Sequence, residues 1–98
     1  MSEPDIKILR ITRLPGDRPL KAYVDIQVGS WTVYDWRVLQ RPGERVQVSY
    51  PQVSYRDAKG VFRYRSLLSV KGELKQRIEV AILSAWEKEI RDGFAGNN

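Results

Sequence analysis

The sequence predicts an α+β domain, with an antiparallel sheet of about five strands followed by one C-terminal helix. Short segments of alternating apolar and polar residues fill the chain up to Leu68, turn residues separate them, and helical spacing follows. Consecutive strands joined by short turns form an antiparallel meander, and a helix must pack on it to bury its apolar stripe. We expect one small domain over residues 1–98, with its ordered core at about 5–92.

Turn residues mark the ends of the expected strands. They occur at Pro15-Gly16-Asp17, at Gly29-Ser30, at Pro42-Gly43 and in a loop from Pro51 to Gly60. Five strands are expected between them: about Ile6–Leu14, Leu20–Val28, Trp31–Gln40, Arg45–Tyr50 and Val61–Leu68.

The second strand has the cleanest alternation, and Gly29-Ser30 suits a two-residue hairpin turn to the third strand. The register that this turn predicts places Val24 opposite Asp35 on the apolar face. On the reverse face it places Tyr23 opposite Trp36.

Asp35 and Arg37 therefore fall on the face that the second strand marks as apolar. Residues two apart on one face lie about 7 Å from each other, since a strand rises roughly 3.3 Å per residue. We interpret Asp35 and Arg37 as a partly buried structural ion pair that fixes the hairpin register, because burying one charge alone costs several kcal/mol. The alternative is that Arg37 reaches a ligand.

The reverse face of the same hairpin carries the aromatic residues Tyr23, Tyr34 and Trp36. An exposed aromatic patch usually marks a contact surface. The patch suits a homodimer interface or a stacking platform for bases, and the alternative is a solvated face with scattered aromatics. We expect a dimer interface.

Helical spacing predicts a helix over about Lys71–Arg91, which Asp92-Gly93 would end. Its apolar stripe consists of Leu74, Ile78, Ala81, Ile82 and Ala85, with Trp86 at its edge. Val80, Leu83 and Ile90 lie outside this stripe, which suggests contact with a second body.

Positive charge is concentrated in one part of the chain. The chain has 17 basic and 12 acidic residues, a net charge of +5, and residues 51–79 contain seven basic residues against three acidic ones. Such an excess favours polyanions. The predicted nucleic-acid-binding residues are Arg56, Lys59, Arg63, Arg65, Lys71, Lys75 and Arg77.

Several classes of function are not expected. The chain has no Cys and no His, so it lacks disulfides, thiolate chemistry, the usual general base and the usual zinc ligands. No nucleophile–base pair is visible, so we expect no catalytic residues, metal, cofactor or small-molecule substrate. No apolar run is long enough to span a bilayer and the first residues lack an apolar stretch, so a cytoplasmic protein without membrane contact is expected.

The order of motifs resembles the stage V sporulation protein G family (SpoVG), bacterial regulators linked to sporulation and to septation in cell division. The matching motifs are Asp5-Ile-Lys-Ile-Leu-Arg10, Asp35-Trp-Arg-Val38, Val48-Ser-Tyr-Pro51, Gly60-Val-Phe-Arg63 and Arg77-Ile-Glu-Val-Ala-Ile-Leu-Ser-Ala-Trp86. The segment after Pro51 differs, since Gln52-Val-Ser54 replaces the family's Ser-Lys-Arg.

The resemblance implies a homodimeric α+β regulator that binds DNA or RNA and has no catalytic activity. In the family, basic residues after that proline and at the start of the helix are associated with nucleic acid. The alternative function, from another class, is a protein–protein interaction module that never touches nucleic acid.

Overall fold

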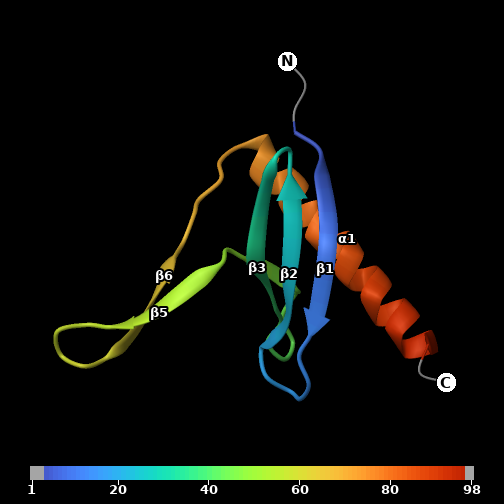
Figure 1. Cartoon of the computed structure of the whole chain (residues 1–98). Helices are drawn as coiled ribbons and strands as arrows, with labels where there is room; N and C mark the ends of the chain where they lie inside the picture. The colour runs from blue at the N-terminus through green and yellow to red at the C-terminus, as the bar shows by residue number, and fades with distance from the viewer. Residues whose placement is uncertain (1–3, 97–98) are drawn as a thin grey trace.

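The computed structural model describes residues 4–96 and confirms the α+β class, with antiparallel strands and one C-terminal helix (Figure 1). The elements are β1 (Ile6–Arg13), β2 (Leu20–Val28), β3 (Trp31–Leu39), β4 (Gln47–Ser49), β5 (Gln52–Arg56), β6 (Phe62–Ser66) and α1 (Glu73–Gly96). Within the described residues no helix has both the length and the apolarity needed to cross a membrane.

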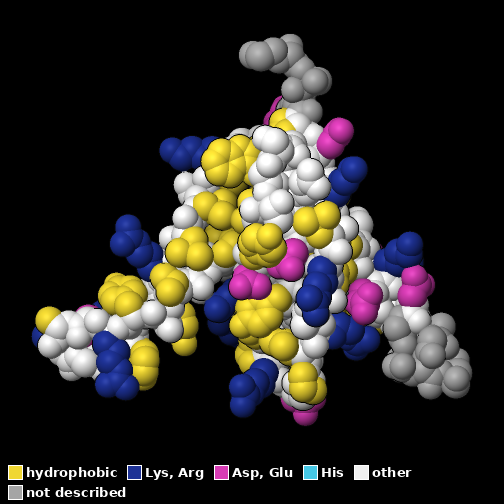
Figure 2. All heavy atoms as spheres, viewed as in Figure 1, with side chains coloured by type: hydrophobic (Ala, Val, Ile, Leu, Met, Phe, Trp, Pro, Cys, Tyr) yellow, Lys and Arg dark blue, Asp and Glu magenta, His cyan; other side chains and the backbone are white. Residues whose placement is uncertain are grey.

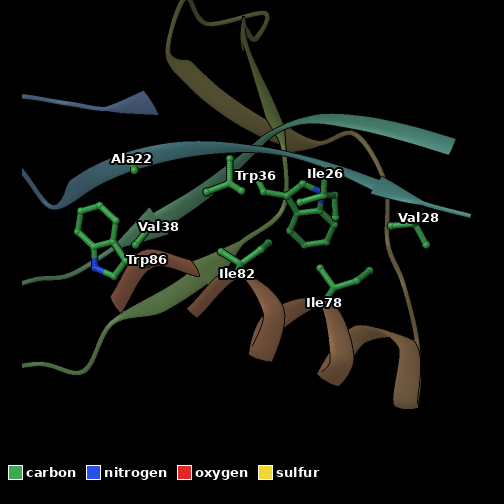
Figure 3. Packing of buried hydrophobic residues seen from close by; sticks show 9 residues of the cluster. Ala22, Ile26, Val28, Trp36, Val38, Ile78, Ile82 and Trp86 are labelled. Carbon is green, nitrogen blue, oxygen red and sulfur yellow. The ribbon is translucent and has the colours of Figure 1, made fainter. Parts of the chain in front are cut away.

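The core lies between α1 and one face of a four-stranded sheet with the order β1-β2-β3-β4. The alternation predicted for β2 is confirmed, because every second residue from Ala22 to Val28 is buried. Figure 3 shows Ile78 and Ile82 of α1 pointing toward Trp36 and Ile26 of the sheet. Burying each such aliphatic side chain contributes about 1.5–3 kcal/mol.

The β2–β3 register differs from the prediction after its first pairs. Val28 does lie opposite Trp31, and Ile26 opposite Val33. The register then shifts, so that Val24 lies opposite Trp36 instead of Asp35.

The cause of the shift is a β-bulge in β3, where Tyr34 and Asp35 together face Asp25. Asp35 has a φ of 65°, and its N–H donates to Asp25 Oδ1 over 3.0 Å. A shift of one residue exchanges the two faces of a strand. Trp36 and Val38 therefore point into the core, and Arg37 lies opposite Tyr23 on the open face.

The fifth expected strand does not join the main sheet. The segment expected to be a loop contains β5, which pairs with β6 as a separate two-stranded sheet. Its sequence alternates Val53 and Tyr55 with polar residues, which suits a strand. We call residues 52–66 the arm, and Figure 1 shows it projecting away from the sheet and helix.

The helix begins two residues later than expected, at Glu73, and continues through Asp92-Gly93, so the predicted C-terminal stop is wrong. Ile78, Ile82 and Trp86 bury the predicted face against the sheet. Val80, outside that face, is exposed as expected.

Candidate nucleic-acid interface and an adjacent apolar groove

The predicted Asp35–Arg37 ion pair is absent. The described residues form three ion pairs, Arg41–Glu44, Arg63–Asp57 and Lys75–Glu79. The β3 bulge explains this result, because it turns Arg37 toward Tyr23, with the guanidinium carbon 5.8 Å from the ring centroid. The charged residues expected on the apolar face thus lie outside the core, and the register is fixed instead by the bond from Asp35 to Asp25.

The predicted aromatic interface is also divided by the bulge. Trp36 is only 2% exposed and its ring lies 5.2 Å from that of Tyr50, so its placement in an exposed interface was wrong. Tyr34 remains exposed, while Tyr23 is half-buried beneath Arg37.

The seven predicted basic residues form two groups. Arg56, Lys59, Arg63 and Arg65 are exposed on the arm, whereas Lys71 lies just before α1 and Lys75 and Arg77 lie in its first turns. Figure 1 shows the arm projecting away from the start of the helix, so the two groups lie on different parts of the fold.

The group at the start of α1 is partly engaged within the molecule. Lys75 lies 4.0 Å from Glu79 and 5.7 Å from the ring of Tyr50. Arg77 Nη2 donates to the carbonyl of Pro4 over 3.0 Å. The arm carries four exposed cations, of which Arg63 is paired with Asp57.

The arm has two different faces, which its register defines. The arginine face carries Arg63 opposite Tyr55 and Arg65 opposite Val53. The aromatic face carries Phe62 and Tyr64, which lie opposite Arg56 and Ser54. The Arg56 guanidinium carbon lies 4.5 Å from the Phe62 ring centroid. Figure 2 shows hydrophobic and basic side chains alternating along the arm.

Asp57 organises the tip of the arm. Its Oδ1 accepts from the N–H groups of Lys59 and Val61 over 2.9 and 3.0 Å, and its Oδ2 accepts from Arg63 Nε over 2.6 Å. These bonds, from Arg63 above all, hold the Asp57 pKa below its usual range. Sequence reasoning missed this role, although an Asp three residues before Gly60 signals a turn closed by the carboxylate.

An apolar groove of ≈ 620 Å³ lies between β3 and the linker from β6 to α1. Trp31 and Val33 line one side, Leu67 and Val70 line the other, and Asp35 lies at its rim. The Tyr50 hydroxyl holds the linker in place, since it donates to the Val70 carbonyl (2.9 Å) and accepts from the Val70 N–H (3.2 Å).

The edge of β3 beside this groove is open. β4 pairs only with Arg37–Leu39, so across residues 31–35 the described part of the chain places no strand on that side. Sequence reasoning missed the groove because it depends on the path of a linker that has no pattern of its own.

No family model and no curated protein matches this sequence. Among residues 4–96 no three His, Cys, Asp or Glu side chains gather in a way that could hold a metal ion. Exposed guanidinium and ammonium groups can bind anions, and the groove can accept apolar side chains.

Proposed function

We propose that this chain is a homodimeric nucleic-acid-binding protein that contacts phosphates through its arm. The observation that carries the proposal is the exposure of Arg56, Lys59, Arg63 and Arg65 on one projecting hairpin, where Asp57 is the one acid. Cations that replace condensed counterions on nucleic acid supply affinity with little sequence preference.

Exposed aromatic rings beside these cations support the same proposal. Phe62 and Tyr64 are 61% and 64% exposed. Flat rings of this kind stack on unpaired bases, at about 1–3 kcal/mol per base. The arm therefore suits single-stranded segments as well as duplex phosphates.

The family resemblance extends the proposal to a cytoplasmic bacterial regulator of sporulation or septation. Asp35-Trp-Arg-Val38 and Gly60-Val-Phe-Arg63 support this reading, because they lie on the β3 bulge and at the start of β6. The first forms part of the β3 bulge, and the second places Arg63 on the arm.

A second candidate function is a protein–protein interaction module without nucleic-acid binding. The apolar groove beside the open edge of β3 favours it, since such an edge accepts an added strand.

Salt-dependent binding distinguishes the two functions. DNA and RNA oligonucleotides are titrated at several salt concentrations, and for duplex DNA the logarithm of affinity falls at a slope near −0.9 per phosphate neutralised. Replacing Arg63 and Arg65 with Ala is expected to reduce that slope by about one unit per lost contact.

The matched control replaces Lys88 and Arg91 with Ala, which removes the same charge from exposed positions on α1. It is expected to leave the slope nearly unchanged. If folded Arg63→Ala/Arg65→Ala protein binds with the wild-type slope, Arg63 and Arg65 do not contact phosphates and the interaction module becomes the better function.

A further inference from the structure

We infer that the apolar groove beside β3 receives the arm of a second copy of this chain. This inference deepens the proposed homodimer, because it states which two surfaces meet. It rests on the proposed function only for self-association and not for nucleic-acid binding.

The surface that would receive the arm is the outer edge of β3, of which only one half is paired with β4. Along residues 31–35 the outer edge of β3 has no neighbouring strand in the described chain, and the groove lies directly beside it. Unpaired N–H and C=O groups on such an edge are a template for another strand. An added strand would bond to this edge and place alternate side chains into the groove.

The segment that would dock there is the arm, which buries almost no surface against its own sheet and helix. Every residue of β5 and β6 except Gln52 is exposed. An isolated two-stranded hairpin is only marginally stable in water. The radius of gyration is 15.0 Å, whereas a compact domain of this length has about 13 Å. A strand of the arm that pairs with β3 would gain a third strand and an apolar cover.

Charge makes the two surfaces complementary. Asp35 at the rim of the groove and the adjacent Asp25 belong to none of the three ion pairs of the described residues. Arg56, which shares the aromatic face of the arm with Phe62, likewise takes part in none of them. Docking of the aromatic face brings Arg56 toward these carboxylates.

The occupant must come from another molecule. Pro51, Gln52 and Leu67 line the groove and are also the root of the arm, where the Leu67 N–H donates to the Pro51 carbonyl over 2.9 Å. An arm that leaves from the wall of the groove cannot turn back into it. Two copies related by a twofold axis would fill both grooves and leave no free arm, so assembly stops at the dimer.

The two faces of the arm would have different partners in the dimer. Phe62 and Tyr64 on the aromatic face suit the apolar groove, whereas Arg63 and Arg65 point to the opposite side. The dimer would therefore keep both arginine faces available to phosphates, whereas Phe62 and Tyr64 would stack on bases only in a chain whose arm is not docked.

Cross-linking between two single-cysteine variants tests the contact. The described residues contain no free cysteine, and the sequence has none, so each introduced thiol is unique. Tyr34→Cys and Tyr64→Cys proteins are mixed and treated with a short bis-maleimide. We expect heterodimers to form rapidly, because Tyr34 lines the groove and Tyr64 belongs to the arm.

The matched control pairs Tyr64→Cys with Val80→Cys, an equally exposed position on α1 outside the groove. It is expected to cross-link at least tenfold more slowly. Equal rates in the two mixtures would overturn the inference.

Light scattering after size-exclusion chromatography gives an independent test. Wild-type protein is expected to be a dimer at micromolar concentration. Replacing Trp31 and Leu67 with Ser is expected to give a folded monomer, because these side chains are 75% and 62% exposed. A wild-type monomer at every concentration, or a variant that remains dimeric, contradicts the inference.

Salt titration of the Trp31→Ser/Leu67→Ser protein separates this inference from the proposed function. The variant keeps all four cations of the arm, so its monomer is expected to bind DNA with about half the wild-type salt slope. If the variant is monomeric and still binds DNA, both the docking of the arm and its binding of nucleic acid are supported. If wild-type protein is a dimer that does not bind nucleic acid, only the proposed function is contradicted.

Discussion

Asp35 has the one positive φ among the described non-glycine residues, and this single conformation decides which side of β3 enters the core. Ahead of the bulge Val33 points inward, and after it Trp36 and Val38 do so. The left-handed conformation is tolerated by Asp better than by most residues, because its short side chain finds local hydrogen bonds. The carboxylate of Asp25 adds a partner for the freed N–H of Asp35.

The stability of variants at Asp35 is expected to depend on how readily the new residue adopts a positive φ. Asp35→Ala should lower the free energy of unfolding by about 1–2 kcal/mol, since Ala disfavours the left-handed region. Asp35→Gly should stay within about 0.5 kcal/mol of wild type, because Gly adopts a positive φ freely. Urea denaturation measures both, and equal losses for the two variants would show that backbone strain does not control the bulge.

Asp57 is expected to make the stability of the tip of the arm depend on pH. Its pKa lies below the usual value when folded, mainly because Arg63 donates to it. The ionised carboxylate therefore stabilises the tip fully above the usual pKa of about 3.9. That stabilisation is lost as the pH falls through the lower folded value.

The amide resonances of Lys59 and Val61, which donate to Asp57, are the measurement. They are expected to shift toward unstructured positions below about pH 3.9, with a midpoint under that value. The Asp57→Asn protein is the control, since it has no carboxyl group to titrate there. A wild-type midpoint above the usual value would contradict the role of Arg63.

At the scale of elements, the sequence predicts best where burial imposes a period. In β2 every second residue is apolar and buried, and in α1 Ile78, Ile82 and Trp86 follow the helical period, so both were predicted. The β3 bulge breaks the period of two at Asp35, and an alternating pattern cannot show where a register shifts.

One strand of the arm escaped prediction for a different reason. The expected strand Val61–Leu68 covers β6, but β5 buries almost nothing within this chain, and Pro51 and Gly60 suggested a loop there. The candidate binding residues on the arm were nevertheless predicted from charge. Their division into two groups depends on the direction of the arm, which charge does not specify.

Because the bulge in β3 buries Trp36 and leaves Tyr34 exposed, substitutions of these two residues are expected to differ in their effect on stability. Trp36→Ala is expected to destabilise the domain by about 3–5 kcal/mol, because it leaves a cavity in the core. Tyr34→Ala, two positions earlier and exposed, is expected to stay within about 0.5 kcal/mol. Chemical denaturation of dilute protein is the measurement. A larger loss for Tyr34 would mean that the bulge lies elsewhere.

At the scale of the whole molecule, stability is distributed unevenly. The sheet and α1 share one buried core, whereas the arm contributes no residue to it. Segments with few buried contacts open at low free energy. The arm is thus the part of the chain whose order depends most on a partner, and both proposed partners contact it.

Hydrogen exchange at increasing protein concentration is expected to reveal that dependence. Amides of the arm and of residues 31–34 should become more protected together as dimers form, because binding stabilises an ordered state by mass action. Amides of β2, which lie inside the sheet, should exchange at a constant rate and serve as the internal control. Added oligonucleotide should then protect the arm further without changing residues 31–34. Exchange rates of the arm and of residues 31–34 that do not change with protein concentration would contradict this expectation. They would mean that the open edge of β3 has no partner in a second copy. The arm would then act alone on nucleic acid.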